Sequence, residues 1–143
     1  MFNDSEGVLY AEVKYTENTQ IISIDNGTSS EAIWIYFLGD DRLRFYSVAG
    51  GGITADIGTG VYNVSSDGYV KLAFRYKAND FAAFRNGVKV GTDISGATPT
   101  GLNQLNFHNG AGSSLFYPKG SLRALHYFPE ALTDTELQQL TTI

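Results

Sequence analysis

Residues Lys71–Val90 read KLAFRYKANDFAAFRNGVKV. Side chains alternate between apolar and polar along the first part of this stretch, which predicts a strand with one buried face, because successive side chains of a strand point to opposite sides. Residues 78–80 are turn formers, and Asn86-Gly87 is a strong signal for a two-residue hairpin. The stretch therefore predicts three consecutive antiparallel strands in the middle of a sheet.

Similar patterns lie on both sides of this hairpin. Thr133 and Glu136 have the spacing of a capping box, which predicts a short helix that ends near Leu140. The fold class expected is all-β, an antiparallel two-sheet sandwich with one short C-terminal helix, and a single domain over residues 1–143. The other strands are expected at residues 8–15, 20–24, 32–38, 42–48, 53–57, 104–109 and 122–128.

Composition and charge exclude several classes of function. The chain has 43% hydrophobic and 17% charged residues, which argues against disorder. Its net charge of -5 argues against nucleic acid or an anionic membrane as the main partner. With no cysteine, neither a disulfide scaffold nor a thiolate metal site is available. The first residues lack the features of a signal peptide, and the longest apolar run, residues 32–38, is too short to span a membrane.

Two segments carry a family resemblance. They are the hairpin that ends in Asn86-Gly87-Val88 and the C-terminal run GSLRALHYFPEALTDTEL, residues 120–137. Together they resemble laminin-G-like or concanavalin A-like jelly-roll domains, of the type found in phage tail and tail-fibre proteins. The resemblance implies a location in the virion or outside the cell, and other fibre subunits as partners, with a homotrimer as one expected assembly. It specifies the fold more closely than the function, because this fold hosts many activities.

A carbohydrate or host-receptor binding module is the function expected, with a bacterial surface glycan or receptor as the partner. Aromatic rings cover the C–H faces of sugars, while polar side chains bond their hydroxyl groups. The outward stripe of a curved sheet is expected to carry such groups on a concave face, above a floor of small residues at Ala73, Ala82 and Ala83. Trp34 and Tyr36 are expected in the core. The candidate binding residues are Arg44, Tyr46, Arg75, Arg85, Asn106, His108, Tyr62 and Tyr117.

Two alternatives stay open. A structural or assembly domain of a virion would place its surface aromatics in a subunit interface. A polysaccharide-degrading enzyme on the same fold needs converging groups, and His108, Arg75 and Tyr46 are the set that a lyase would use. The Glu-x-Asp-x-x-Glu motif of glucanases with this fold is absent, so no catalytic residue is assigned.

Calcium is kept as a candidate cofactor. Calcium needs several oxygen ligands at one place, and turn carboxylates supply them in many domains of this type. The candidate ligands are Asp25, Asp40 and Asp41. Two separate turns would have to meet for these residues to share one ion, and ordinary hydrogen bonding within the turns is the competing interpretation.

Overall fold

The computed structural model describes residues 2–15, 20–38, 42–58, 68–111 and 120–143. Within these ranges the chain forms strands, apart from one short C-terminal helix. The elements are β1 (Glu6–Tyr15), β2 (Gln20–Asp25), β3 (Ala32–Phe37), β4 (Leu43–Ala49), β5 (Gly52–Gly58), β6 (Tyr69–Lys77), β7 (Phe81–Arg85), β8 (Val88–Asp93), β9 (Gln104–Asn106), β10 (Gly120–Phe128) and α1 (Asp134–Thr141).

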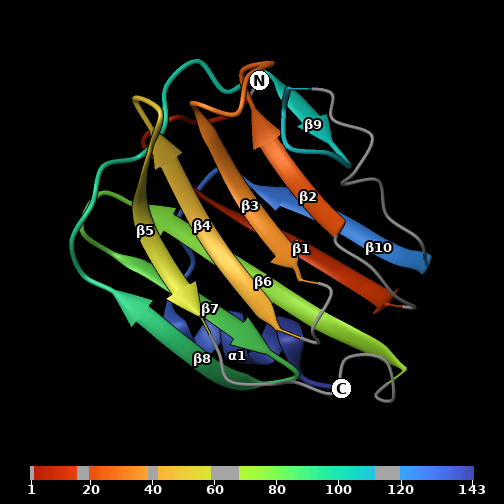
Figure 1. Ribbon diagram of the computed structural model, residues 1–143. Helices are drawn as coiled ribbons and strands as arrows, with labels where there is room; N and C mark the ends of the chain where they lie inside the picture. The colour runs from red at the N-terminus through yellow and green to blue at the C-terminus, as the bar shows by residue number, and fades with distance from the viewer. Residues whose placement is uncertain (1, 16–19, 39–41, 59–67, 112–119) are drawn as a thin grey trace.

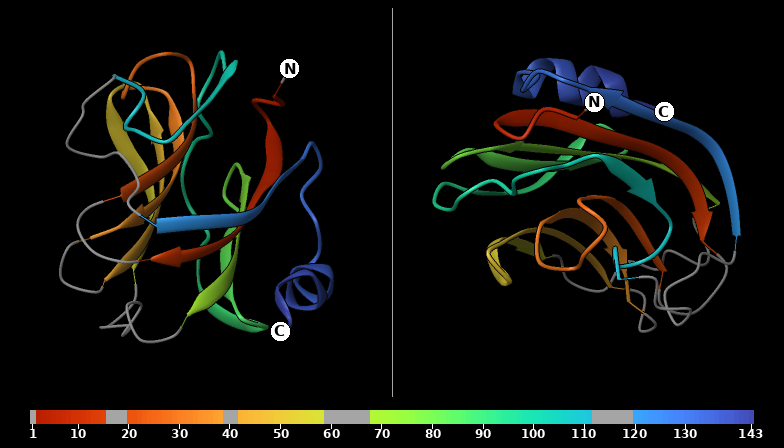
Figure 2. Two further views of the ribbon diagram at one scale, coloured as in Figure 1. Left: turned by 90° about the vertical axis from the view of Figure 1, so that its right-hand side faces the viewer. Right: turned by 90° about the horizontal axis from the view of Figure 1, so that it is seen from above.

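Two five-stranded antiparallel sheets lie face to face. Sheet A has the strand order β10-β1-β6-β7-β8, and sheet B has the order β5-β4-β3-β2-β9. Figure 1 shows sheet B in front of sheet A, with α1 behind sheet A. The view from above in Figure 2 separates the three layers, in the order α1, sheet A, sheet B. The two-sheet sandwich with one C-terminal helix is therefore confirmed.

The central hairpin has the predicted strands and turns. Asn86 and Gly87 both have positive φ angles, 48° and 80°, which is the backbone that a two-residue hairpin of this type requires. Asn79 also has a positive φ of 59°, in the turn between β6 and β7. These turns place β6, β7 and β8 side by side in sheet A, as the sequence predicts.

Most strand boundaries agree with the prediction to within two residues, and the ends of β8 and β9 differ by three. β8 continues to Asp93 because Gly91 and Thr92 pair with Ala83 and Ala82 beyond a bulge at Val90 of β8. β9 ends at Asn106 because it is an edge strand that pairs with only three residues of β2. The segment after Val90, although it contains a glycine, is therefore part of β8 at the edge of sheet A. The alternating segment after Asn106 is not part of β9 at the edge of sheet B.

The main core lies between the sheets. Val70, Leu72, Phe74 and Tyr76 face it from β6 and are fully buried. The ring of Phe74 contacts Phe45 across the sandwich, with 5.5 Å between ring centroids. This is the face that the alternation of β6 assigns to the interior.

A second core lies on the other side of sheet A. Leu137 of α1 is fully buried against Ala73, Ala82 and the ring of Phe84. The small side chains let the helix approach the sheet closely. The expectation that Ala73 and Ala82 form the floor of a ligand site is therefore wrong, because α1 occupies that space. Ala83 points into the core between the sheets instead.

The helix begins with the predicted capping box. The backbone N–H of Glu136 donates to the hydroxyl of Thr133 at 3.3 Å, and the backbone N–H of Thr133 donates to the carboxylate of Glu136 at 2.7 Å. The second bond is the main cause of a lowered pKa of Glu136. In the described part of the chain, no helix is long and apolar enough to cross a membrane.

Candidate functional site

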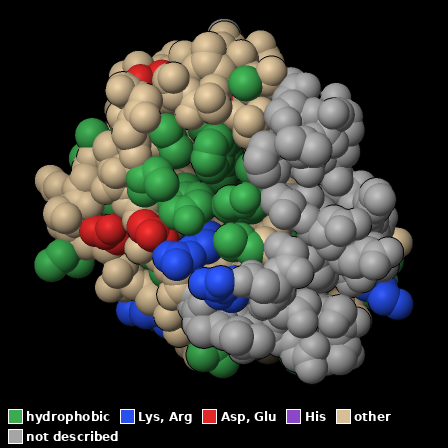
Figure 3. Space-filling model, viewed as in Figure 1, with side chains coloured by type: hydrophobic (Ala, Val, Ile, Leu, Met, Phe, Trp, Pro, Cys, Tyr) green, Lys and Arg blue, Asp and Glu red, His purple; other side chains and the backbone are tan. Residues whose placement is uncertain are grey.

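The outer face of sheet B carries no helix, unlike that of sheet A (Figure 2). Ile33 and Ile35 of β3 point into the core, so Trp34 and Tyr36 point outward by strand alternation. The cross-strand partner of Trp34 on β4 is Tyr46. Figure 3 shows apolar side chains at the centre of this face, with acidic and basic groups beside them.

Three aromatic residues, Trp34, Tyr36 and Tyr46, form what we call the aromatic patch. The rings of Trp34 and Tyr46 meet edge to face, with centroids 6.3 Å apart and an interplanar angle of 80°. The centroids of Tyr36 and Tyr46 are 6.0 Å apart. All three side chains are half-buried. The expectation of Trp34 and Tyr36 in the core is therefore wrong, since both lie on the outer side of a sheet whose inner side is filled by the isoleucines of β3.

The patch also presents polar atoms. The indole Nε1 of Trp34 is buried and has no hydrogen-bond partner among the described residues. A buried donor without a partner is costly, so a ligand oxygen that reached this N–H would relieve that cost. Burial is the main cause of raised pKa values for Tyr36 and Tyr46, which keeps their hydroxyls neutral at physiological pH. The patch therefore combines apolar rings with uncharged hydrogen-bonding groups.

Arg44 borders the aromatic patch. Its Nη1 donates to both carboxylate oxygens of Asp56 on β5, at 2.8 and 3.0 Å. Gly58 is the cross-strand partner of Arg44, and a Cβ atom at Gly58 would overlap the guanidinium group. The arginine thus lies across a glycine to reach an acid two residue pairs further along the ladder. Arg44 and Tyr46, two of the predicted binding residues, are brought together here.

Asn106 lies at the opposite side of this face, where β9 pairs with β2. Its Nδ2 donates to both carboxylate oxygens of Asp25, at 3.0 and 2.9 Å. Asp25 is fully buried and also accepts from the hydroxyl of Ser23 at 2.6 Å and from the backbone N–H of Gly27 at 2.8 Å. Asn106 therefore holds a buried carboxylate in place.

Arg75 lies on the other sheet. It is 8% exposed, and its Nη2 donates to Asp80 at 2.7 Å, while its Nη1 donates to Asp134 at 2.8 Å and to the carbonyl of Leu132 at 3.0 Å. These bonds connect sheet A to the start of α1. The expectation of a shared face with Arg44 and Tyr46 is wrong, because β6 and β4 belong to different sheets and these side chains point to opposite sides of the sandwich.

The remaining candidates are dispersed. Arg85 ends β7 in sheet A, opposite Leu72. His108 follows β9, and its Nδ1 accepts a hydrogen bond from the backbone N–H of Gly110 at 3.0 Å. The set proposed for a lyase, His108, Arg75 and Tyr46, is therefore divided between the two sides of the molecule. Tyr62 and Tyr117 lie outside the described residues.

The described residues do not assemble a metal site. No group of three or more His, Asp or Glu side chains with the geometry to hold a cation occurs in the described ranges. Asp25 does not fit a calcium ligand, because its oxygens already accept hydrogen bonds from a hydroxyl, a backbone N–H and an amide. Asp40 and Asp41 lie outside the described residues.

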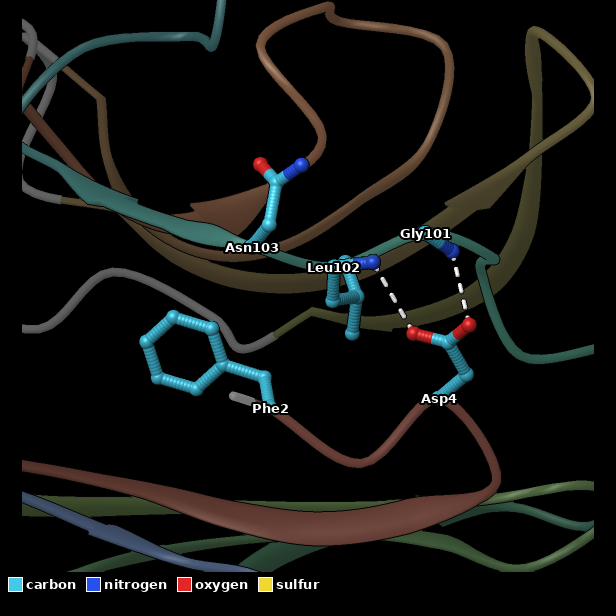
Figure 4. Close-up of a pocket in the computed structure, with 5 residues that line it drawn as sticks. All are labelled: Phe2, Asp4, Gly101, Leu102 and Asn103. Atoms are coloured by element: carbon cyan, nitrogen blue, oxygen red, sulfur yellow. Dashed lines mark hydrogen bonds between the residues drawn. The ribbon is translucent and has the colours of Figure 1, made fainter.

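A small pocket of about 260 Å³ opens at one end of the sandwich. Figure 4 shows the ring of Phe2 and the side chain of Leu102 turned toward each other across it. The carboxylate of Asp4 accepts from the backbone N–H groups of Gly101 at 2.7 Å and Leu102 at 2.9 Å. The acid of this pocket therefore joins the N-terminal segment to the connection between the sheets. Asn103 completes the lining.

Asp56 is a site residue that sequence reasoning missed. In residues 53–57, ITADI, Thr54 and Asp56 occupy alternate positions between apolar residues, which is a signal for outward-facing groups. The register then places Asp56 directly opposite Tyr46. The alternation of side chains along β5 could have identified Asp56 as outward-facing, but the pairing register was needed to place it beside Arg44.

The sequence of residues 5–138 matches the family described as the concanavalin A-like lectin/glucanases superfamily. The chain belongs to this family. The match covers nearly the whole chain and agrees with the two-sheet architecture. No curated protein sequence matches the chain at a significant level.

Solved structures with the same fold come from several organisms. The CBM40 module of a Ruminococcus gnavus IT-sialidase, bound to α2,3 sialyllactose, has a TM-score of 0.73 and 19% identity, covering 97% of this chain and 84% of the module. A leech intramolecular trans-sialidase has a TM-score of 0.75 and 18% identity over 99% of this chain, but only 24% of the enzyme is covered. Mouse laminin α1 domains LG4-5 have a TM-score of 0.68 and 8% identity, covering 92% of this chain and 37% of theirs. At identities this low, the structural similarity shows a common fold alone.

Proposed function

We propose that the chain is a non-catalytic carbohydrate-binding module that holds a glycan on the outer face of sheet B. The observation that carries this proposal is the aromatic patch, whose partly exposed rings lie on a face that no described helix covers, and in which the Trp34 indole N–H is buried without a partner among the described residues. Rings stack on sugar C–H groups, and a desolvated donor favours a ligand that brings an acceptor. The fold shared with the CBM40 module supports the same class of ligand.

The expected setting is the surface of a phage tail or fibre, with a bacterial surface glycan or receptor as the target. This part of the proposal rests on the resemblance of the hairpin and of the C-terminal run to tail-fibre domains. Calcium dependence stays a prediction for Asp40 and Asp41, so binding is to be measured with and without a chelator.

Tryptophan fluorescence tests the proposal directly. Trp34 is the one tryptophan of the chain, so its emission reports on this face alone. Titration with a binding glycan is expected to shift or quench the emission. Trp34→Ala is expected to weaken binding by about fivefold, because stacking of a ligand on an aromatic ring is worth on the order of 1 kcal/mol.

A matched control is Tyr69→Ala, which removes a half-buried aromatic from the outer side of sheet A, where Arg123 stacks on its ring with 3.7 Å to the centroid. We expect it to keep full glycan affinity. Equal loss in both variants would contradict a site on sheet B. A wild-type trimer that Trp34→Ala dissociates, in the absence of glycan binding, would instead favour the structural alternative.

A further inference from the structure

The charges around the aromatic patch suggest which sugars this face accepts. Arg44 is the cross-strand partner of Tyr36 in the patch, and both oxygens of Asp56 accept from its Nη1. The side chains of Arg44 and Asp56 keep 31% and 42% of their exposure, so the pair faces the space that a ligand would occupy. A ligand approaching Arg44 therefore meets a carboxylate that is already bound to it.

A second carboxylate stands behind the first. Asp93, at the end of β8, accepts a hydrogen bond from the backbone N–H of Asp56 at 3.3 Å, so it lies at the same edge of the face. The buried Asp25 lies at the opposite edge, where its described partners are neutral. Arg42 is exposed just before β4. Among the described residues, Asp56 and Asp93 therefore lie at the edge of this face that carries Arg44.

We propose that Asp56 makes this face selective for uncharged sugars over acidic ones. This inference rests on the proposed function. An acidic sugar is bound best by an arginine whose planar fork is available for two parallel bonds to its carboxylate. Here the Nη1 group of Arg44 is already bound to Asp56, so the fork is not fully available, and the acid of the sugar would also face two protein carboxylates. An uncharged sugar meets no such barrier and uses the rings and the neutral hydroxyls of Tyr36 and Tyr46.

Gly58 contributes to this selectivity by letting Arg44 reach Asp56. A Cβ atom at this position would overlap the guanidinium group. The pair therefore depends on the absence of a side chain at the neighbouring strand position. Sialyllactose, the ligand named for the Ruminococcus gnavus module, is an acidic glycan, so this chain is expected to differ from that module in ligand charge.

The experiment compares neutral oligosaccharides with acidic oligosaccharides that share their core, such as lactose and sialyllactose, or a neutral glucan fragment and its uronic acid counterpart. Wild type is expected to bind the neutral member of a pair at least about tenfold more tightly. Asp56→Asn keeps the shape of the side chain and removes its charge, so it is expected to narrow that ratio severalfold by strengthening binding of the acidic member.

Two further variants separate the causes. Glu130→Gln removes one exposed carboxylate away from the patch, and it is expected to leave the ratio at the wild-type value. The double variant Arg44→Gln with Asp56→Asn has no cation to expose, so it is expected to lose the gain for acidic sugars. Thermal unfolding of each variant confirms that it is folded.

The outcomes distinguish the two proposals. Wild type that prefers the acidic member, or Asp56→Asn and Glu130→Gln with the same ratio, overturns the selectivity while the binding function stands. Neutral binding that survives Trp34→Ala unchanged overturns the site itself, and absence of binding to every glycan overturns both proposals.

Discussion

On the outer side of sheet A, Ala73 and Ala82 lie beneath Leu137 of α1, whereas on the outer side of sheet B the rings of Trp34 and Tyr46 are half-exposed. Both faces come from strands with the same alternation of inward and outward side chains. Beneath Leu137 the small side chains of Ala73 and Ala82 leave room for the helix, and the ring of Phe84 packs beside it. The docked helix therefore distinguishes the outer face of sheet A from that of sheet B, where we place the ligand.

Their polar groups differ in the same way. Arg75 of sheet A is buried, and its Nη1 and Nη2 groups donate to Asp80, Asp134 and the Leu132 carbonyl. Arg44 of sheet B is partly exposed, as is its partner Asp56. An arginine on an outward stripe is a binding residue only where its face stays open.

The largest expected effect comes from removing the side chain that joins α1 to sheet A. Leu137→Ala is expected to lower the free energy of unfolding by about 3 kcal/mol, because a fully buried leucine leaves a cavity. Chemical denaturation measures this change. Gln139→Ala, on the exposed side of the same helix, is the control and is expected to have little effect. A loss of glycan affinity without loss of stability in Leu137→Ala would reverse the roles of the two faces.

Arg75→Ala is expected to have the next largest effect, about 2 kcal/mol in the free energy of unfolding, because it removes hydrogen bonds between a buried cation and two carboxylates. Glycan affinity is expected to stay at the wild-type value, since the side chain lies under α1. Both quantities are measured on the same preparation. If affinity falls while the unfolding midpoint stays in place, Arg75 belongs to the binding site and the assignment of the two faces is wrong.

Thr133→Ala removes the hydroxyl of the capping box and is expected to lower the free energy of unfolding by about 1 kcal/mol. Thr133→Ser keeps the hydroxyl and is expected to restore most of the stability. The comparison is made by thermal unfolding, with Trp34 emission in the folded state as a check that sheet B is unchanged. Equal destabilisation by Ser and Ala would show that the cap does not stabilise the docked helix.

Mild acid is expected to have the smallest effect, and on one face only. The bond with Lys89 is the main cause of a lowered pKa of Asp134, and the bond with the Thr133 backbone is the main cause for Glu136. Because the folded pKa values lie below the ordinary 3.8 and 4.5, the stability these groups supply is present above those values and is lost as the pH falls through the lowered ones. Amide resonances of α1 are expected to shift below about pH 4 before Trp34 emission changes. Simultaneous changes would mean that the two faces are not independent.

The sequence was sufficient for the strands, the turns and the helix cap, because each depends on neighbours within a few residues. Asn86-Gly87 and the Thr133–Glu136 box are local signals, and the structure has both. Which face the helix covers was not predictable in the same way, because α1 packs on Ala73 although the two are far apart in the sequence. Alternation gives two faces without saying which one meets a helix.

The candidate site shows the same limit. Arg44 and Tyr46 could be placed on one face, since both belong to one strand with period two. Their neighbours Trp34 and Asp56 come from two other strands, and the register that joins them is set by tertiary pairing. A lone tryptophan in an apolar strand predicts a position in the core, and only the position of β3 within sheet B shows that no described helix covers its outer side.

The pairing of β1 has a consequence for how the chain reaches this structure. Val8 pairs with Arg75 on one side and with Phe128 on the other, so both neighbours of β1 come from distant parts of the chain. Contacts of such separation slow folding into the range of milliseconds to seconds in proteins of this class. During synthesis β1 must wait for β6 and then for β10 to leave the ribosome. Until then the apolar side chains and the backbone of β1 are unpaired. An unpaired strand of this kind can pair with a strand of another chain.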